Sequence, residues 1–207
     1  VLFICIFVFA PMIGALVMSF QTGKGVNVRF AGLANYQRIL TDTTVRKALG
    51  NTFIYLIVQV PVMIVLALVI SVMLNDKKLR GVNFFRVAIF LPCITSLVSY
   101  SLIMKNIFSD DGLFNQLLIR LNMTPIQWTT DPFWAKVIII VAITWRWTGY
   151  NMIFYLSGLQ NIEPSIYEAA EIDGVNSFQK LTRITVPLLK PIVLFTTITS
   201  TIGTLQL

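Results

Sequence analysis

The sequence predicts an all-α, polytopic membrane protein: a transmembrane helical bundle with about five spans. The mean hydropathy of the 207 residues is +0.78, and only 12% of them are charged, which differs strongly from a soluble domain of this size. Residues 1–20, 48–75 and 87–104 contain no Asp, Glu, Lys or Arg. Each of these ranges can cross the roughly 30 Å hydrocarbon layer as a helix, in which all backbone hydrogen bonds are satisfied internally.

Helices and loops are expected to alternate along the chain. We expect helices over 1–20, 48–74, 87–107, 133–157 and from 189 onward, joined by loops over 21–47, 75–86, 108–132 and 158–188. Pro61 and Pro92 are expected to bend their helices. The chain begins at Val1 and ends inside an apolar run. We therefore interpret it as a fragment truncated at both ends, with its first stretch a membrane span rather than a signal peptide.

The net charge of +7 is attributed to Lys and Arg that flank the spans rather than to binding of nucleic acid. Basic residues are dense in two loops that alternate across the membrane, so charge alone leaves the orientation undecided: Lys77, Lys78, Arg80 and Arg86 in one, and Lys24, Arg29, Arg38, Arg46 and Lys47 in the other. Cys5 and Cys93 have neither disulfide nor metal spacing, and the chain has no His. We expect no metal site.

A polar segment, residues 163–191, separates the last two apolar stretches. Ser165 followed by Glu168 fits a capping box, which predicts that a helix begins at Ser165. Gly174 can adopt a positive φ and end that helix. Asn176 can then cap a second helix, with Gln179 at the answering position. The prediction is two short helices joined by a glycine turn, lying across the membrane surface.

The residue types of the first short helix are typical of a docking surface. Ala169 and Ala170 permit close approach of another protein, while Glu168, Glu171 and Asp173 offer carboxylates to a partner's Lys or Arg. A helix seated in a partner's groove can transmit movement to the adjacent spans. A helix resting on the bilayer is the alternative, but it would be richer in Lys and Arg. Catalytic carboxylates are not supported, since no nucleophile, metal ligand or phosphate-binding glycine loop accompanies them.

The same segment resembles the cytoplasmic loop of ABC importer permeases that docks on a partner ATPase. In that family Glu-Ala-Ala is followed by three residues, Gly, nine residues, Ile, one residue and Leu-Pro. The residues here at those spacings are Glu168, Ala169, Ala170, Gly174, Ile184 and Pro187, with Val186 in place of Leu. The resemblance implies that residues 163–188, hereafter the coupling loop, contact the ATPase through these residues and Asp173, within one permease domain over 1–207.

Three shorter matches point to the sugar-type branch of these permeases: residues 30–36 (Phe-Ala-Gly-Leu-Ala-Asn-Tyr), 112–115 (Gly-Leu-Phe-Asn) and 158–162 (Gly-Leu-Gln-Asn-Ile). The resemblance implies a MetI-like permease core in the cytoplasmic membrane of a prokaryote, with loops 75–86 and 158–188 on the cytoplasmic side. The implied partners are a second permease subunit, a cytoplasmic ABC ATPase dimer and an extracytoplasmic solute-binding protein. ATP and Mg would bind the ATPase, and this chain would hold no cofactor.

Arg146, in the middle of the fourth span, is the most unusual polar residue. A guanidinium in the membrane is costly unless it faces water or a partner, so it marks a candidate pathway. Trp147, Tyr150 and Asn151 could join it to contact the ring and hydroxyls of a sugar. An equally favoured alternative is that Arg146 reaches an interface or pairs structurally. The other polar residues of the spans are more typical of helix packing: Asn51, Gln59, Thr95, Ser96, Ser99 and Tyr100.

The sequence therefore predicts a permease that moves a sugar or oligosaccharide by alternating access and is not itself an enzyme. Polyols such as glycerol phosphate stay open as substrates. Two other classes also stay open. An ion-coupled secondary transporter would typically need carboxylates inside the membrane, and the expected spans contain none. A membrane receptor or scaffold would use the coupling loop for docking without transport.

Overall fold

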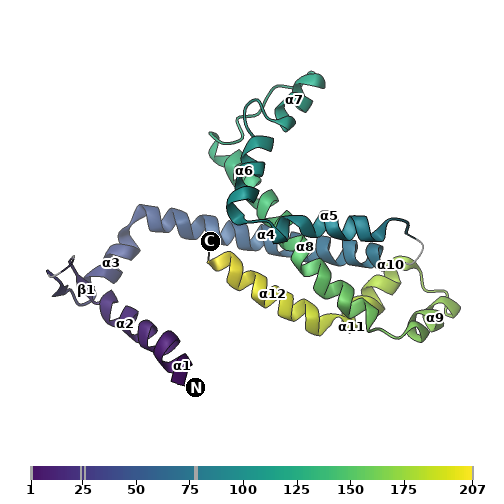
Figure 1. Ribbon diagram of the computed structural model, residues 1–207, viewed down its shortest axis with the longest axis horizontal. Coiled ribbons are helices and arrows are strands. Elements are labelled where there is room, and N and C mark those ends of the chain that lie inside the picture. The colour runs from purple at the N-terminus through teal and green to yellow at the C-terminus, as the bar shows by residue number, and fades with distance from the viewer. Residues whose placement is uncertain (1, 24, 26, 77–78, 207) are drawn as a thin grey trace. The chain divides into compact units, whose positions relative to one another are not determined.

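The computed structural model describes residues 2–23, 25, 27–76 and 79–206 (Figure 1). Five residues on which predictions were based lie outside these ranges: Val1, Lys24, Lys77, Lys78 and Leu207. The chain forms two compact units, residues 1–53 and 54–207. The single domain expected over 1–207 stays a prediction.

The first unit consists of an apolar helix, a small hairpin and a short helix. The apolar helix comprises α1 (Leu2–Ile4), a π-helical turn η1 (Cys5–Phe9) and α2 (Ala10–Ser19). Strands β1 (Gln21–Thr22) and β2 (Arg29–Phe30) pair antiparallel, with Gln21 opposite Phe30. Helix α3 (Ala34–Thr41) follows, and α4 begins at Thr43. The loop expected over 21–47 therefore contains secondary structure that hydropathy alone did not indicate.

Asn35 holds this unit together. Its Nδ2 donates hydrogen bonds to the carbonyl oxygens of Ser19 and Gln21, at 2.9 and 2.8 Å. The hydroxyls of Tyr36 and Ser19 lie 2.6 Å apart, and the Tyr36 ring packs on Phe20. These bonds fix the end of α2 against the start of α3, which explains why the Asn-Tyr pair stands at this place in the sequence.

The second unit contains the remaining helices. Helix α4 runs from Thr43 to Asn75 and crosses the unit boundary in sequence. The other elements are α5 (Val82–Ile94), α6 (Leu97–Ile107), α7 (Leu113–Arg120), α8 (Pro132–Gln160), α9 (Pro164–Ile172), α10 (Ser177–Gln179), the π-helical η2 (Lys180–Thr185), α11 (Val186–Leu188) and α12 (Lys190–Leu205). Within this unit α4, α5, α8 and α12 form the bundle, and α6 and α7 extend from one end of it (Figure 1).

Within the described residues, three helices are long and apolar enough to cross a membrane: 2–19, 43–75 and 132–160. The total is up to five if each of two bent pairs counts as one span, which agrees with the five spans expected. One bent pair is α10–α11 with α12, at 74°, and the other is α5 with α6, at 107°.

The third span departs from the single helix expected over 87–107. The helix breaks at Thr95 and Ser96, where Thr95 is extended and the Ser96 hydroxyl accepts a hydrogen bond from the backbone N–H of Ser99. A capped helix start at Ser96 therefore replaces continuous helix. Neither proline ends a helix, since α4 continues through Pro61 and α5 continues for two residues after Pro92.

Buried polar side chains join three helices of the bundle. Thr204 of α12 donates to the Gln59 side-chain oxygen of α4 at 3.0 Å, and Asn151 of α8 donates to the Ser200 hydroxyl of α12 at 3.3 Å. Tyr155 and Thr196 make a third contact, with their hydroxyls 2.7 Å apart. Hydrogen bonds between membrane helices fix the register in which the helices pack.

An aromatic cluster organises the connection between α6 and α8. Trp128 is buried, and its ring meets Phe108 edge-on at 5.3 Å and Trp134 at 5.0 Å between centroids. Asn115 of α7 is fully buried beside this cluster and makes four hydrogen bonds. Its Oδ1 accepts from Ile126 N and Trp128 Nε1, and its Nδ2 donates to the carbonyl oxygens of Asp110 and Ile126. Asn115 therefore ties α7 to the segments before and after it, at Asp110, Ile126 and Trp128.

Candidate functional site

The coupling loop begins with α9, one residue earlier than the sequence predicted. Glu163 is the extended N-cap residue and Pro164 occupies the first helical position, which suits its fixed φ. The Ser165 hydroxyl donates to the Glu163 carboxylate at 3.4 Å and does not cap the helix. The predicted Ser165–Glu168 capping box is therefore wrong, because Pro164 moves the start of the helix.

The end of α9 has the form that the sequence predicted. Gly174 has φ of +73°, a conformation that glycine adopts without steric cost. Its N–H donates to the carbonyl oxygen of Glu171 at 3.1 Å, and the N–H of Val175 donates to that of Ala170 at 3.0 Å. These two bonds form a Schellman motif, which satisfies the last carbonyl groups of the helix. The chain therefore turns sharply and in a defined direction after Asp173.

A second helical segment, α10 to α11, packs back against α9. The predicted capping box at Asn176 and Gln179 is confirmed, with reciprocal bonds of 2.8 and 3.2 Å. Lys180 forms an ion pair with Glu171 at 2.6 Å, and the Tyr167 hydroxyl lies 3.1 Å from that of Thr185. These contacts make the two halves of the coupling loop one connected structure.

The coupling-loop residues identified in the sequence fall into two groups. Glu168, Ala169, Asp173, Gly174 and Pro187 are exposed. Ala170 is only 5% exposed and Ile184 is half-buried. Ala170 therefore packs inside the loop. The exposed surface of α9 and the turn after it combines the acidic side chains and Ala169 with Ile166 and Ile172, which is 86% exposed.

The second candidate site is a cavity of about 260 Å³ beside α8. Arg146, Trp147 and Tyr150 line it together with Cys93 of α5, which the sequence did not indicate. The Trp147 and Tyr150 rings meet edge-on, with centroids 5.4 Å apart. The structure thus brings together three of the four predicted residues, and it places a guanidinium beside two aromatic rings.

Arg146 also has a structural role. Its Nη1 donates to the carbonyl oxygen of Thr95 at 3.3 Å, and its guanidinium lies 5.7 Å from the centre of the Tyr100 ring. Thr95 is the C-cap residue of α5, and a cation is favourable at the carbonyl end of a helix. The pathway interpretation and the structural interpretation of Arg146 therefore both have support. The side chain lines the cavity, and it also stabilises the break between α5 and α6.

Asn151 does not belong to the cavity. It is fully buried, and its Nδ2 donates to Trp147 O, Ser200 Oγ and the Met63 sulfur. Five residues along an α-helix correspond to a rotation of about 140°, so Asn151 faces away from Arg146. The expectation that Asn151 lines the same pathway as Arg146 is not met, because Asn151 joins α8 to α12.

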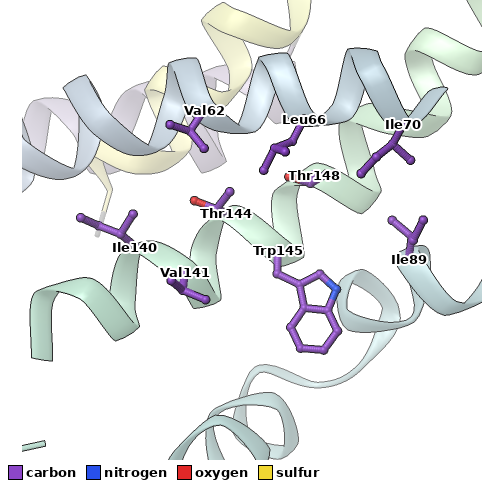
Figure 2. Close-up of a pocket in the computed structure, with 9 residues that line it drawn as sticks. All are labelled: Val62, Leu66, Ile70, Ile89, Ile140, Val141, Thr144, Trp145 and Thr148. Atoms are coloured by element: carbon purple, nitrogen blue, oxygen red, sulfur yellow. The ribbon is translucent and has the colours of Figure 1, made fainter. Parts of the chain in front are cut away.

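A larger cavity, of about 400 Å³, lies between α4, α5 and α8 (Figure 2). Figure 2 shows side chains of all three helices around it: Val62, Leu66, Ile70, Ile89, Ile140, Val141, Thr144, Trp145 and Thr148. Almost all of this lining is apolar. The hydroxyls of a sugar would lose their hydrogen bonds there, so the smaller cavity at Arg146 is the better candidate for a sugar.

Gly203 of α12 is a further residue that sequence reasoning missed. A Cβ atom at this position would lie 3.4 Å from the Trp147 ring, in ordinary van der Waals contact, so a side chain larger than that of alanine would press on the indole. No pattern in the sequence links the two residues. Among the described residues, no group of three or more Cys, Asp or Glu is arranged to hold a metal ion.

Residues 43–207 match the family described as "Binding-protein-dependent transport system inner membrane component". The chain is 55% identical over 206 residues to the lactose transport system permease protein LacF of Rhizobium radiobacter, covering 99% of this chain and 69% of that protein. It is 38% identical over 197 residues to the arabinooligosaccharides transport system permease protein AraP of Halalkalibacterium halodurans, covering 94% and 62%.

The fold is similar to a chain of a bacterial alginate ABC transporter, solved in complex with an alginate pentasaccharide-bound periplasmic protein. The TM-score is 0.81 at 24% identity, over 93% of this chain and 65% of that chain. The chain spans about two thirds of the length of these relatives. The all-α permease fold and the resemblance to sugar-type permeases are therefore confirmed.

Proposed function

The chain belongs to the family of inner membrane components of binding-protein-dependent transport systems, and on this premise we propose that it is a permease subunit of an ATP-driven sugar importer. Its relatives are permease subunits and not enzymes. The substrate is a sugar or oligosaccharide, which moves across the cytoplasmic membrane by alternating access. The coupling loop is the single observation that carries this proposal.

The coupling loop has two properties of a surface that binds a partner ATPase: an internally connected structure and exposed charged side chains. Its two halves are joined by the Lys180–Glu171 ion pair, while Glu168 and Asp173 project outward. In the proposal these carboxylates pair with basic residues of the partner, which strengthens their hydrogen bonds. The loop follows α8 directly and leads into α12, so displacement of the loop moves both helices.

The partners in this proposal are a second permease subunit, a cytoplasmic ABC ATPase dimer and an extracytoplasmic solute-binding protein. The ATPase holds ATP and Mg and hydrolyses the nucleotide, and this chain binds no cofactor. Closure of the ATPase dimer moves the coupling loop, which lies on the cytoplasmic side. The cavity at Arg146 then becomes accessible from the opposite side of the membrane.

In the cavity, Trp147 and Tyr150 supply apolar ring surfaces for the C–H face of a sugar. Arg146 supplies hydrogen-bond donors for hydroxyl oxygens. The aromatic and guanidinium groups lie around one volume of about 260 Å³, and this grouping supports the proposed sugar contact.

Reconstitution of the full complex in vesicles tests the proposal through two variants of the coupling loop. Glu168→Lys reverses a charge at the contact, and Gly174→Asp forces a side chain into the left-handed conformation at φ +73°. We expect both variants to release the ATPase subunits or to uncouple hydrolysis from uptake. Asp111→Lys, an equal charge change on the opposite side of the membrane, should retain the ATPase.

Normal ATPase retention and normal uptake in both coupling-loop variants would contradict the docking role. The same preparation separates the alternative classes. A scaffold would show no hydrolysis stimulated by sugar and its binding protein, and a secondary transporter would move sugar without ATP. Either result, obtained with all subunits present, would overturn the importer proposal.

A further inference from the structure

Helix α7 and its C-cap residue carry a line of exposed leucines. Leu113, Leu117 and Leu121 follow each other at intervals of four residues, and their side chains are 59%, 45% and 69% exposed. Residues four apart lie on the same side of an α-helix, so the three side chains form one continuous apolar strip. Such a strip on a soluble loop would be unfavourable in water.

Phe114 and Asn115 fix α7 to the rest of the unit. The Phe114 ring stacks on Phe108 with centroids 4.6 Å apart, and Asn115 is held by its four hydrogen bonds. Helix α7 therefore cannot rotate to hide its leucines without breaking these contacts. The direction in which the leucine strip faces is set by the structure.

The aromatic cluster also joins α7 to the start of α8. Trp128 connects Phe108 and Phe114 on one side to Trp134 on the other, and Trp134 lies in the first turn of α8. Tryptophan is enriched at the level of the lipid headgroups, where a span leaves the hydrocarbon. Lys136, two residues further along α8, has the position of a basic residue at the headgroups. Trp134 and Lys136 are thus the residue types expected where α8 leaves the hydrocarbon, and the aromatic cluster joins α7 to that turn of α8.

Two polar side chains of α7 fit the pattern of an interfacial helix, although Ile119, on the side away from the strip, is also 56% exposed. Gln116 and Arg120 are exposed and lie on the flank next to the leucine strip. The Arg120 guanidinium can pair with lipid phosphate while the leucines enter the acyl region. We propose that α7 binds the surface of the lipid bilayer through Leu113, Leu117 and Leu121 and anchors the connection between α6 and α8 there. This role is independent of the transported substrate.

Site-specific photocrosslinking tests this surface in the complete transporter. The photoreactive residue p-benzoylphenylalanine replaces Leu117, or Gln116 as the matched control one residue away. Each complex is reconstituted in vesicles of phosphatidylethanolamine and phosphatidylglycerol with the solute-binding protein present. Mass spectrometry then identifies what is attached to α7. We expect on the order of five-fold more lipid adduct at position 117 than at position 116, because only the leucine flank enters the acyl region.

Replacement of Leu113 provides a second position on the strip if the Leu117 variant does not assemble. Adducts to the solute-binding protein, the second permease or the ATPase as the main product on the strip would show that a protein covers it and would overturn the proposal. Equal lipid adduct at 116 and on the strip would overturn it as well, since α7 would then have no preferred side toward the bilayer.

Discussion

Substitution of Gly149 by Ala should weaken the packing of α8 against α5. The Cβ of an alanine at this position would lie 2.3 Å from the carbonyl oxygen of Ile89 and 3.2 Å from the Phe90 Cα. Non-bonded atoms pack at about 3.5 Å, so the two backbones would have to separate by about 1 Å. Overpacking of this kind costs about 1–3 kcal/mol. It acts against the gain of about 1 kcal/mol that alanine gives in a helix.

Gly50→Ala is the matched control, because Gly50 is also helical and a Cβ there meets no atom within 4 Å among the described residues. Both variants receive the same helix-propensity gain, so their difference isolates the steric cost. At about 2–4 °C per kcal/mol, the purified Gly149→Ala protein should melt about 2–12 °C below the Gly50→Ala protein. Melting of both variants within about 1 °C of each other would refute the close approach of α5 and α8.

Three further outcomes are expected. Asn115→Ala removes four hydrogen bonds and leaves buried donors unpaired, at a cost of about 2–4 kcal/mol; faster amide hydrogen exchange over 108–132 measures the loss, and unchanged exchange would contradict it. Gly203→Leu should displace the Trp147 ring and raise the KM for uptake, whereas unchanged uptake would argue against a sugar site there. Hydrogen bonding from the Thr44 backbone N–H lowers the pKa of Asp42, so Asp42 stabilises the start of α4 above its unfolded pKa and loses that effect as pH falls through the lower folded pKa. The amide protection factors at the start of α4, which are corrected for the intrinsic pH dependence of exchange, should fall in acid, and Asp42→Asn should remove this dependence.

The sequence predicted the coupling loop well because its signals are local. Gly174 and Asn176 act on backbone groups within a few residues, and both form the turn and cap that their residue types favour. The failure at Ser165 is also local. A proline at 164 competes with a serine at 165 for the start of the same helix, and the proline decides it.

Other features that the sequence did not predict depend on residues distant in sequence. The break between α5 and α6 is stabilised by Arg146, which lies 51 residues after Thr95. The contact between Gly203 and Trp147 likewise joins two helices. By contrast, the face on which Asn151 lies could have been predicted from helical geometry alone, because the rotation from Arg146 is fixed by spacing.

The hydrogen bonds of Gln59 to Thr204, Asn151 to Ser200 and Tyr155 to Thr196 have a consequence for how the bundle can rearrange. All three pairs include a residue of α12. If α12 slides along α4 and α8, its hydroxyls leave their partners at about the same displacement, and partial sliding strands polar groups in apolar surroundings. The helices therefore have a few stable registers separated by unfavourable ones, and transitions between them should occur as discrete jumps rather than as gradual drift.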